Sequence, residues 1–169
     1  EVVLTSLPVP RDVEAVVQGE NGILEGATEG SIYVDLSTNS PTVIRRLHQV
    51  CADRGVTMLD APVSGGVYGA AAATLAVMVG GDEDVFNKVK PTLDAIGSHV
   101  IYCGPIGNGS VCKICNNLLS MGIGCLMSEA LTLGVKAGVD LAVLADAIAN
   151  SSGGSKRLTE KFPRFLFKG

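Results

Sequence analysis

Residues 104–117, G-P-I-G-N-G-S-V-C-K-I-C-N-N, separate a part of the chain with alternating strand and helix patterns from a part with helix patterns only. The glycine-rich turn closes a strand pattern and opens a long apolar helix pattern that has Lys113 in its first turn. Asn116 and Asn117 follow three and four residues later, so one helix face presents an ammonium and two amides to a small polar ligand. A lysine that snorkels to water from a core helix has the same local pattern, so the rest of the chain must decide.

Before this stretch, apolar runs of strand length alternate with helical patterns. Strands are expected at residues 2–7, 31–36, 56–61, 74–79 and 99–103. Helical patterns begin near Asp12, at Pro41 and after Asp82, which we expect to cap its helix. Strands that alternate with helices in this way predict a parallel sheet built from βαβ units.

Small polar and glycine residues follow three of the expected strands, as Leu7-Pro8, Ser37-Thr38 and Ser64-Gly65-Gly66. Ligands of open α/β sheets bind at the carboxyl ends of the strands. Convergence of three such ends therefore predicts a ligand site at this edge. Asp35 and Asp60 also lie at strand ends, where we favour capping over a catalytic role for their carboxylates.

After residue 106 the pattern becomes entirely helical, which predicts two domains, residues 1–106 and 107–169. The first long helix, over residues 110–137, carries many small residues, and we expect it to be packed on most sides. Its most apolar part, residues 118–135, is interrupted by polar side chains. This favours a buried helix over a membrane span.

Composition narrows the class of protein. Apolar residues make up 47 % and charged residues 18 %, and the formal net charge is −4 without a basic patch, which disfavours nucleic acid as a partner. The odd number of cysteines, five, favours a reducing compartment. No zinc site is expected, because neither His48 nor His99 has a ligand spacing relative to Cys112 and Cys115. For those two cysteines, helix packing is favoured over a redox dithiol at the helix N-terminus.

Read together, the motifs resemble those of the β-hydroxyacid dehydrogenase family, especially 3-hydroxyisobutyrate dehydrogenases and tartronate semialdehyde reductases. The motifs are L-P at 7–8, D-L-S-T at 35–38, D-A-P-V-S-G-G at 60–66, M-V-G-G at 78–81 and G-x-G-x-x-x-K-x-x-N-N at 107–117. The resemblance implies an α/β fold, in which the C-terminal part of a Rossmann-type parallel sheet is followed by the start of an all-helical domain. It also implies a fragment that lacks the first nucleotide-binding βαβ unit and the C-terminal helices.

The resemblance further implies a substrate site. Lys113 would be the catalytic residue, in proton contact with the substrate hydroxyl during hydride transfer. Ser64, Gly65 and Gly66 would bind the substrate carboxylate, and Asn117 would hydrogen-bond and orient the substrate.

The implied cofactor is NAD or NADP, with NAD favoured, and Leu7, Pro8 and Thr38 would contact it. A Gly-x-Gly-x-x-Gly turn, which cradles the pyrophosphate in such folds, does not occur in the printed chain. We therefore expect that the chain as printed neither binds the dinucleotide tightly nor turns over.

The expected function is hydride transfer between nicotinamide and a short, anionic 3-hydroxy acid. Ser120 occupies the position where decarboxylating relatives carry glutamate, so loss of CO₂ is not expected. The alternative is a non-catalytic scaffold or oligomerisation relative, disfavoured because Lys113 and Asn117 are present. Expected partners are the substrate and further copies of the chain, as a dimer or tetramer through the helical domain, without nucleic acid or membrane. The expected compartment is the cytoplasm, or the mitochondrial matrix in a eukaryote.

Overall fold

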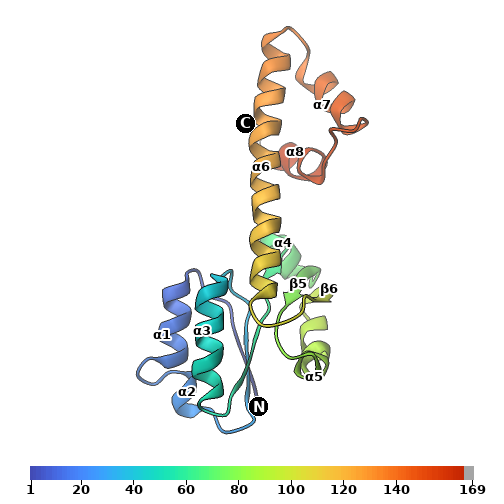
Figure 1. The fold of residues 1–169 in the computed structure, drawn as a ribbon. Helices are drawn as coiled ribbons and strands as arrows, with labels where there is room; N and C mark the ends of the chain where they lie inside the picture. Colours follow the sequence, from blue (N-terminus) through green and yellow to red (C-terminus); the bar gives the residue numbers. More distant parts are fainter. Residues whose placement is uncertain (166–169) are drawn as a thin grey trace. The chain divides into compact units, whose positions relative to one another are not determined.

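The computed structural model describes residues 1–165 of the 169-residue chain. It divides into two compact units, Glu1–Cys115 and Asn116–Gly169, which are described separately below. Helix α6 runs from the first unit into the second (Figure 1). The domain boundary that the sequence predicts after residue 106 stays a prediction.

The first unit begins with a three-stranded parallel sheet in the order β1-β2-β3. Its strands are β1 (Val2–Thr5), β2 (Ile32–Asp35) and β3 (Thr57–Asp60). The connecting helices are α1 (Pro10–Gln18), α2 (Ile23–Gly26) and α3 (Pro41–Ala52). The sequence predicts all of these except α2, which is a single helical turn.

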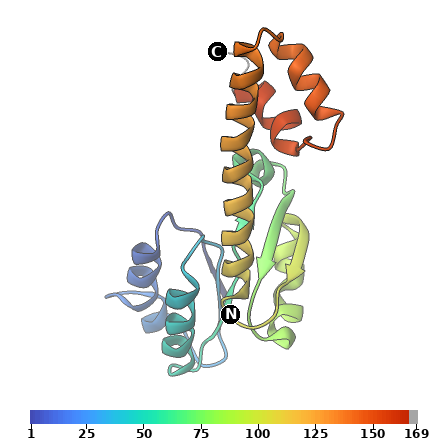
Figure 2. The same cartoon turned by 45° about the horizontal axis from the view of Figure 1, so that its top comes forward.

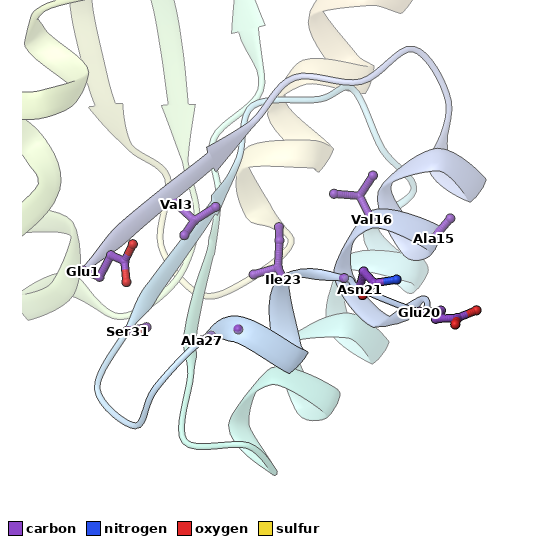
Figure 3. Close-up of a pocket in the computed structure, with 11 residues that line it drawn as sticks. Glu1, Val3, Ala15, Val16, Glu20, Asn21, Ile23, Ala27 and Ser31 are labelled. Carbon is purple, nitrogen blue, oxygen red and sulfur yellow. The ribbon is translucent and has the colours of Figure 1, made fainter.

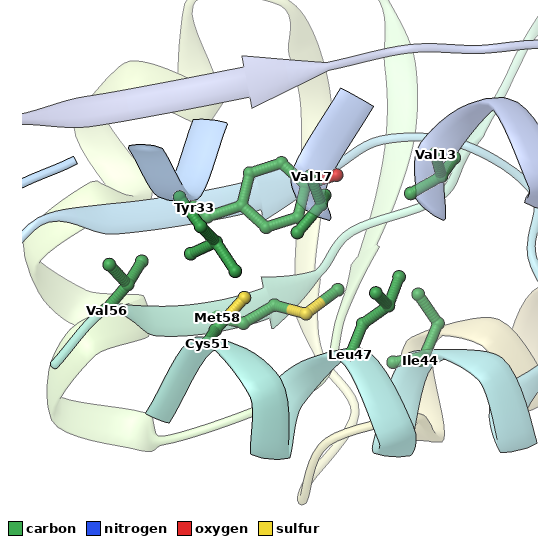
Figure 4. Close-up of a cluster of buried hydrophobic side chains, with 9 residues drawn as sticks. Val13, Val17, Tyr33, Ile44, Leu47, Cys51, Val56 and Met58 are labelled. Atoms are coloured by element: carbon green, nitrogen blue, oxygen red, sulfur yellow. The ribbon is translucent and has the colours of Figure 1, made fainter. Parts of the chain in front are cut away.

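Alternate residues of the strands supply two different cores, because successive side chains in a strand point to opposite faces. Tyr33 and Met58 pack against α1 and α3 in one cluster, where Ile44 and Leu47 meet them from α3 (Figure 4). Val34 and Leu59, the next residues along, belong to the other cluster. β2 and β3 are buried on both faces, whereas Val2 and Leu4 of the edge strand β1 are 39 % and 36 % exposed.

The rest of the first unit is a second sheet in the order β4-β5-β6. Its elements are β4 (Val63–Ser64), α4 (Gly66–Ala71), β5 (Leu75–Val79), α5 (Glu83–Asp94) and β6 (Gly97–Tyr102). As the sequence predicts, Asp82 caps α5: its carboxylate accepts a hydrogen bond from the Val85 N–H at 3.0 Å. Figure 2 shows α5 beside β5 and β6.

The expectation of one wholly parallel sheet is wrong for the segment between β3 and β5. β5 and β6 are parallel, but β4 pairs with β5 in the antiparallel direction, and Asp60 forms an antiparallel bridge with Gly80. A parallel crossover needs a dozen or more residues, usually with a full helix. Between β4 and β5 the chain has only the short helix α4, so it turns back on itself instead.

The second unit consists of helices. α6 (Asn108–Lys136) contributes most of its length, and α7 (Leu141–Ala149), the π-helical turn η1 (Arg157–Lys161) and α8 (Phe162–Phe165) follow. Met127 and Leu131 of α6 form a small core with Leu158 and Phe162. The expectation that α6 is packed on most sides is wrong for the described residues, because other apolar side chains of the helix, such as Leu118 and Leu133, are each 72 % exposed.

By length and composition alone, α6 could also cross a membrane. Its 29 residues include an 18-residue window with a mean hydropathy of 1.6, of which 17 % is buried. One such helix is weak support for a membrane span, since core helices of soluble proteins satisfy the same criteria. The expectation that the protein does not use a membrane stays a prediction.

Candidate functional site

The buried carboxylate of Asp60 holds the start of α6 in place. Its Oδ1 accepts a hydrogen bond from the Gly107 N–H at 2.7 Å. Its Oδ2 accepts hydrogen bonds from the Ser110 N–H and the Ser110 hydroxyl at 2.7 and 2.8 Å. The first N–H groups of a helix have no partner within the helix, so Asp60 acts as a cap supplied by a distant strand. Capping rather than catalysis is the role that the sequence favours for Asp60.

Burial raises the pKa of Asp60, and the hydrogen bonds from Gly107 and Ser110 oppose this rise. The side chain is completely inaccessible to solvent. All three donors are N–H or O–H groups that point at the carboxylate, and the N-terminus of a helix favours negative charge. The geometry therefore suits an ionised carboxylate that fixes strand β3 to α6.

Two glycines make this close approach of strand and helix possible. A Cβ on Gly80 would overlap the Asp60 carboxylate and lie 2.8 Å from the backbone nitrogen of Gly109. A Cβ on Gly109 would overlap the carbonyl oxygen of Met78 and lie 2.8 Å from that of Asp60. The absence of side chains at these positions lets the first turn of α6 rest directly on the ends of β3 and β5.

Lys113 lies one turn beyond this anchor and is buried, with 8 % exposure. Burial lowers the pKa of its ammonium. Lys113 lines a cavity of about 570 Å³ together with Ser64, Gly65 and Gly66, so the structure brings together these four residues predicted from the sequence. All of them belong to the first unit.

The cavity combines one charge with apolar walls. Of the described residues that line it, only Lys113 is ionisable, and Leu36, Leu75 and Ile96 are among the apolar ones. Gly65 and Gly66 have φ values of +144° and +64°, which side-chain-bearing residues rarely adopt. A Cβ on Gly66 would meet no atom within 4 Å, so the backbone is open to a ligand there. The cavity thus suits a small anionic ligand that also has an apolar part or lies beside an apolar group.

The predicted cofactor residues lie at the ends of β1 and β2. Ser37 joins the two ends, because its hydroxyl accepts a hydrogen bond from the Leu7 N–H at 2.8 Å. Pro8 and Thr38 are exposed beside this link. Asp35, at the end of β2, is buried. Its Oδ1 accepts a hydrogen bond from the Ser37 N–H at 3.0 Å, and its Oδ2 accepts one from the Asn39 side-chain amide at 3.3 Å. Asp35 therefore shapes the loop, as the sequence favours.

Asn117 follows Lys113 by four residues in α6 but belongs to the second unit. Its amide oxygen accepts a hydrogen bond from Asn116 at 3.4 Å. The substrate-orienting role that the resemblance implies for Asn117 stays a prediction.

A second cavity, of about 530 Å³, lies beside β1, α1 and α2 (Figure 3). Figure 3 shows the carboxylates of Glu1 and Glu20 among its lining residues. Negative charge disfavours a carboxylate or phosphate ligand, and Lys113 does not line this cavity. The cavity around Lys113 is therefore the better candidate for the functional site.

No metal site forms in the described part of the chain: residues 1–165 contain no group of three His, Cys, Asp or Glu side chains that could hold an ion. What sequence reasoning missed is the link between Asp60 and Ser110. The sequence offered only two signals for it. Asp60 lies at the end of an expected strand, and Ser110 lies in a helix that follows a glycine-rich turn. Fifty residues separate the two partners, and local patterns do not encode such pairings.

Two protein-family profiles together match nearly the whole chain. Residues 1–104 match the profile of the NAD binding domain of 6-phosphogluconate dehydrogenase. Residues 107–169 match the profile described as NAD-binding of NADP-dependent 3-hydroxyisobutyrate dehydrogenase. The two profiles meet at the glycine-rich turn that precedes α6.

Individual relatives agree with these profiles. The chain is 41 % identical over 172 residues to 2-(hydroxymethyl)glutarate dehydrogenase of Eubacterium barkeri, covering 100 % of this chain and 56 % of the relative. It is 43 % identical over 153 residues to the probable mitochondrial 3-hydroxyisobutyrate dehydrogenase of Dictyostelium discoideum, covering 90 % of this chain and 47 % of the relative. The chain thus spans about half the length of these curated relatives, which come from bacteria and from mitochondria.

A solved structure is similar in fold as well as in sequence. Mycobacterium tuberculosis 3-hydroxyisobutyrate dehydrogenase with L-serine has a TM-score of 0.87 and 37 % identity, covering 95 % of this chain and 54 % of that chain. This similarity confirms the Rossmann-type α/β fold that the motifs predict.

Proposed function

The chain belongs to the β-hydroxyacid dehydrogenase family, and from this membership we propose that the intact protein transfers hydride between a nicotinamide cofactor and a short 3-hydroxy acid. The observation that carries the proposal is the buried Lys113, which shares one cavity with Ser64, Gly65 and Gly66. Relatives of the chain are named for 3-hydroxyisobutyrate and 2-(hydroxymethyl)glutarate, and both compounds are 3-hydroxy acids.

In this proposal Lys113 accepts the proton of the substrate hydroxyl during oxidation and donates it during reduction. Oxidation of an alcohol removes the O–H proton while the adjacent carbon gives up hydride, so a base must lie within hydrogen-bond reach of the oxygen. Burial lowers the pKa of Lys113 and so increases the neutral amine available as that base. In the reverse direction, the Lys113 ammonium protonates the oxygen of the reduced substrate.

Ser64, Gly65 and Gly66 hold the substrate carboxylate. The Ser64 hydroxyl can donate a hydrogen bond to it, and the open backbone at Gly66 lets the anion approach closely. The ammonium of Lys113 in the same cavity favours the negative charge. Asn117, one turn after Lys113 in α6, orients the substrate by hydrogen bonding.

The residues present fit the nicotinamide end of the cofactor. The cavity has an apolar wall that includes Leu36, directly after β2, and Leu7, Pro8 and Thr38 lie at the neighbouring strand ends. When bound there, a nicotinamide would supply the hydride acceptor or donor. The Leu36 wall would exclude water from the reacting carbon, and Leu7, Pro8 and Thr38 would contact the cofactor.

Loss of CO₂ is not part of the proposed reaction. Ser120, two turns after Lys113, provides no carboxylic acid. Its hydroxyl instead accepts a hydrogen bond from the Arg157 guanidinium at 3.0 Å. We further propose that the intact protein is a dimer or tetramer through its helical part, in the cytoplasm or the mitochondrial matrix, without nucleic acid or membrane as partner.

A substrate panel tests the proposal. The intact protein would be assayed with 3-hydroxyisobutyrate, 2-(hydroxymethyl)glutarate, L-serine and, in the reducing direction, tartronate semialdehyde, each with both nicotinamide cofactors. We expect cofactor-dependent turnover of at least one acid and no release of CO₂. Absence of turnover with all of them would favour the non-catalytic scaffold.

Replacing Ser64 with alanine is expected to raise KM about tenfold to a hundredfold, because a hydrogen bond to a charged group contributes about 1.5–3 kcal/mol. Steady-state kinetics on the best acid of the panel measure the change. Ser98, exposed on β6, is the matched control, and its replacement with alanine should leave KM unchanged. An unchanged KM in Ser64→Ala would remove Ser64 from the carboxylate site.

A further inference from the structure

A small cavity in the second unit brings together positive charge and neutral hydrogen-bond donors. Its volume is about 220 Å³, and α6 supplies Asn116 and Ser120 to its wall. The segment that leads into η1 supplies Ser155, Lys156 and Arg157. Of the described residues that line the cavity, only Lys156 and Arg157 are ionisable, and both are cationic.

The guanidinium of Arg157 lies against the backbone of α6. Its Nη1 donates a hydrogen bond to the Ser120 hydroxyl at 3.0 Å. A Cβ on Gly124, one turn after Ser120, would lie 2.5 Å from the Nε and 2.9 Å from the Cζ of this guanidinium. The missing side chain of Gly124 therefore makes the space that the guanidinium fills. Ser120 and Gly124 together hold the half-buried Arg157 in one place.

The charge of Arg157 lacks a carboxylate partner within residues 1–165. None of the ion pairs formed there includes Lys156 or Arg157. The Nε of Arg157 is also buried without a hydrogen-bond partner among these residues. Removal of a charge from water is costly unless an opposite charge or hydrogen bonds compensate for it. An anion in the cavity would supply this compensation.

We propose that the cavity binds the carboxylate of a short aliphatic acid. A planar guanidinium presents several N–H donors in a fixed arrangement that matches the two oxygens of a carboxylate. The hydrogen bond to Ser120 uses one of these donors, and others remain for the ligand. The Ser120 hydroxyl is the acceptor in that bond, so its own O–H can donate to the carboxylate, as can the hydroxyl of Ser155.

The apolar part of the wall favours a carboxylic acid over inorganic phosphate. Leu119 and Ile123 line the same cavity and suit a hydrocarbon group. Pockets for drug-sized ligands usually have about 300–1,000 Å³, so a cavity of about 220 Å³ suits a smaller molecule. A bound acid would link α6 to the segment before η1 and stabilise the second unit by mass action.

This site is independent of the proposed dehydrogenase activity. Its described lining residues all belong to the second unit, whereas Lys113 belongs to the first. Binding of an acid at Arg157 therefore needs neither the nicotinamide nor the ammonium of Lys113.

The test is a titration of the intact Lys113→Met protein with sodium isobutyrate, followed by ligand-observed NMR, which also detects weak binding. This background removes the ammonium from the cavity of Lys113, so the signal reports on the cavity of Arg157. We expect saturable binding of isobutyrate. Isobutyramide, which has the same shape without the charge, should bind at least about tenfold more weakly. Inorganic phosphate should also bind more weakly than isobutyrate.

Two further substitutions in the same background examine the guanidinium. Arg157→Met should weaken isobutyrate binding about tenfold to a hundredfold, because charge-assisted hydrogen bonds are lost. Gly124→Ala should weaken it as well, since the added methyl group displaces the guanidinium. Gly122→Ala is the matched control, because a Cβ there would meet no neighbouring atom within 4 Å. It should leave the binding unchanged.

The proposal would be overturned if Arg157→Met and Gly124→Ala both bound isobutyrate as before, or if isobutyramide or phosphate bound at least as tightly as isobutyrate. Thermal unfolding checks that each variant is folded. If Arg157→Met does not fold, Gly124→Ala decides, since alanine favours a helix more than glycine does. Turnover of the wild-type protein without isobutyrate binding in the Lys113→Met protein would refute this site and leave the proposed function standing.

Discussion

Replacing Lys113 with methionine in the intact protein is expected to lower kcat by about 10²- to 10⁴-fold, the usual contribution of a positioned acid or base. Methionine retains the length of the side chain and suits the apolar walls of the cavity, so the loss reports on the amine rather than on packing. The measurement is steady-state turnover with the acid that the wild-type protein accepts best.

Lys90→Met is the matched control for this experiment. Lys90 is partly exposed on α5, pairs with Asp94 at 2.8 Å, and does not line the cavity of Lys113. It should retain wild-type kcat. If Lys113→Met also retained it, the catalytic role of Lys113 would be wrong.

The pH dependence of stability provides a second readout for the same variant. Because burial lowers the pKa of Lys113, the folded protein releases this proton at a lower pH than the unfolded chain does. The buried ammonium therefore reduces stability at neutral pH, and this cost disappears as the pH rises through the lowered pKa toward the ordinary value of 10.5. Lys113→Met should be more stable than the wild type at neutral pH, and the difference should shrink at alkaline pH. Urea unfolding across this range measures both quantities.

Turnover should depend on the same ionisation. Oxidation of the hydroxy acid needs neutral Lys113, so its rate should rise with pH through a transition below 10.5. Reduction needs the ammonium, so its rate should fall through the same transition. Rates of both directions that stay flat with pH would indicate that another group moves the proton.

Replacing Asp60 with alanine is expected to lower the free energy of unfolding by roughly 3–5 kcal/mol, because each buried donor left without a partner costs about 1–3 kcal/mol. The substitution removes the acceptor of the Gly107 N–H, the Ser110 N–H and the Ser110 hydroxyl. Urea unfolding followed by circular dichroism measures the change. Activity should fall as well, because the turn that carries Lys113 loses its anchor.

Asp82→Ala is the control, since Asp82 also caps a helix but is exposed. Loss of an ordinary N-cap costs about 1 kcal/mol. Asp60→Asn, which retains the shape and one acceptor oxygen, should fall between the two. Equal losses for Asp60→Ala and Asp82→Ala would show that Asp60 is only a local cap.

Much of the site could be predicted because its chemistry lies in short motifs. The D-A-P-V-S-G-G run and Lys113 in its helix identified the family, and the structure brings Ser64, Gly65, Gly66 and Lys113 to one cavity. The roles of Leu7, Pro8, Thr38 and Asn117 stay predictions, since strand-end and helix positions alone do not show what they bind.

The sequence by itself determined the alternation of strands and helices and the Asp82 cap. These features follow from steric preferences and hydrophobic periodicity over a few neighbouring residues. Only the tertiary structure decided that Asp60 anchors α6 and that β4 runs antiparallel to β5. Each of these depends on which distant segments come together. That choice is set by connection length and by the donors and acceptors that burial leaves to be paired, and no local pattern records it.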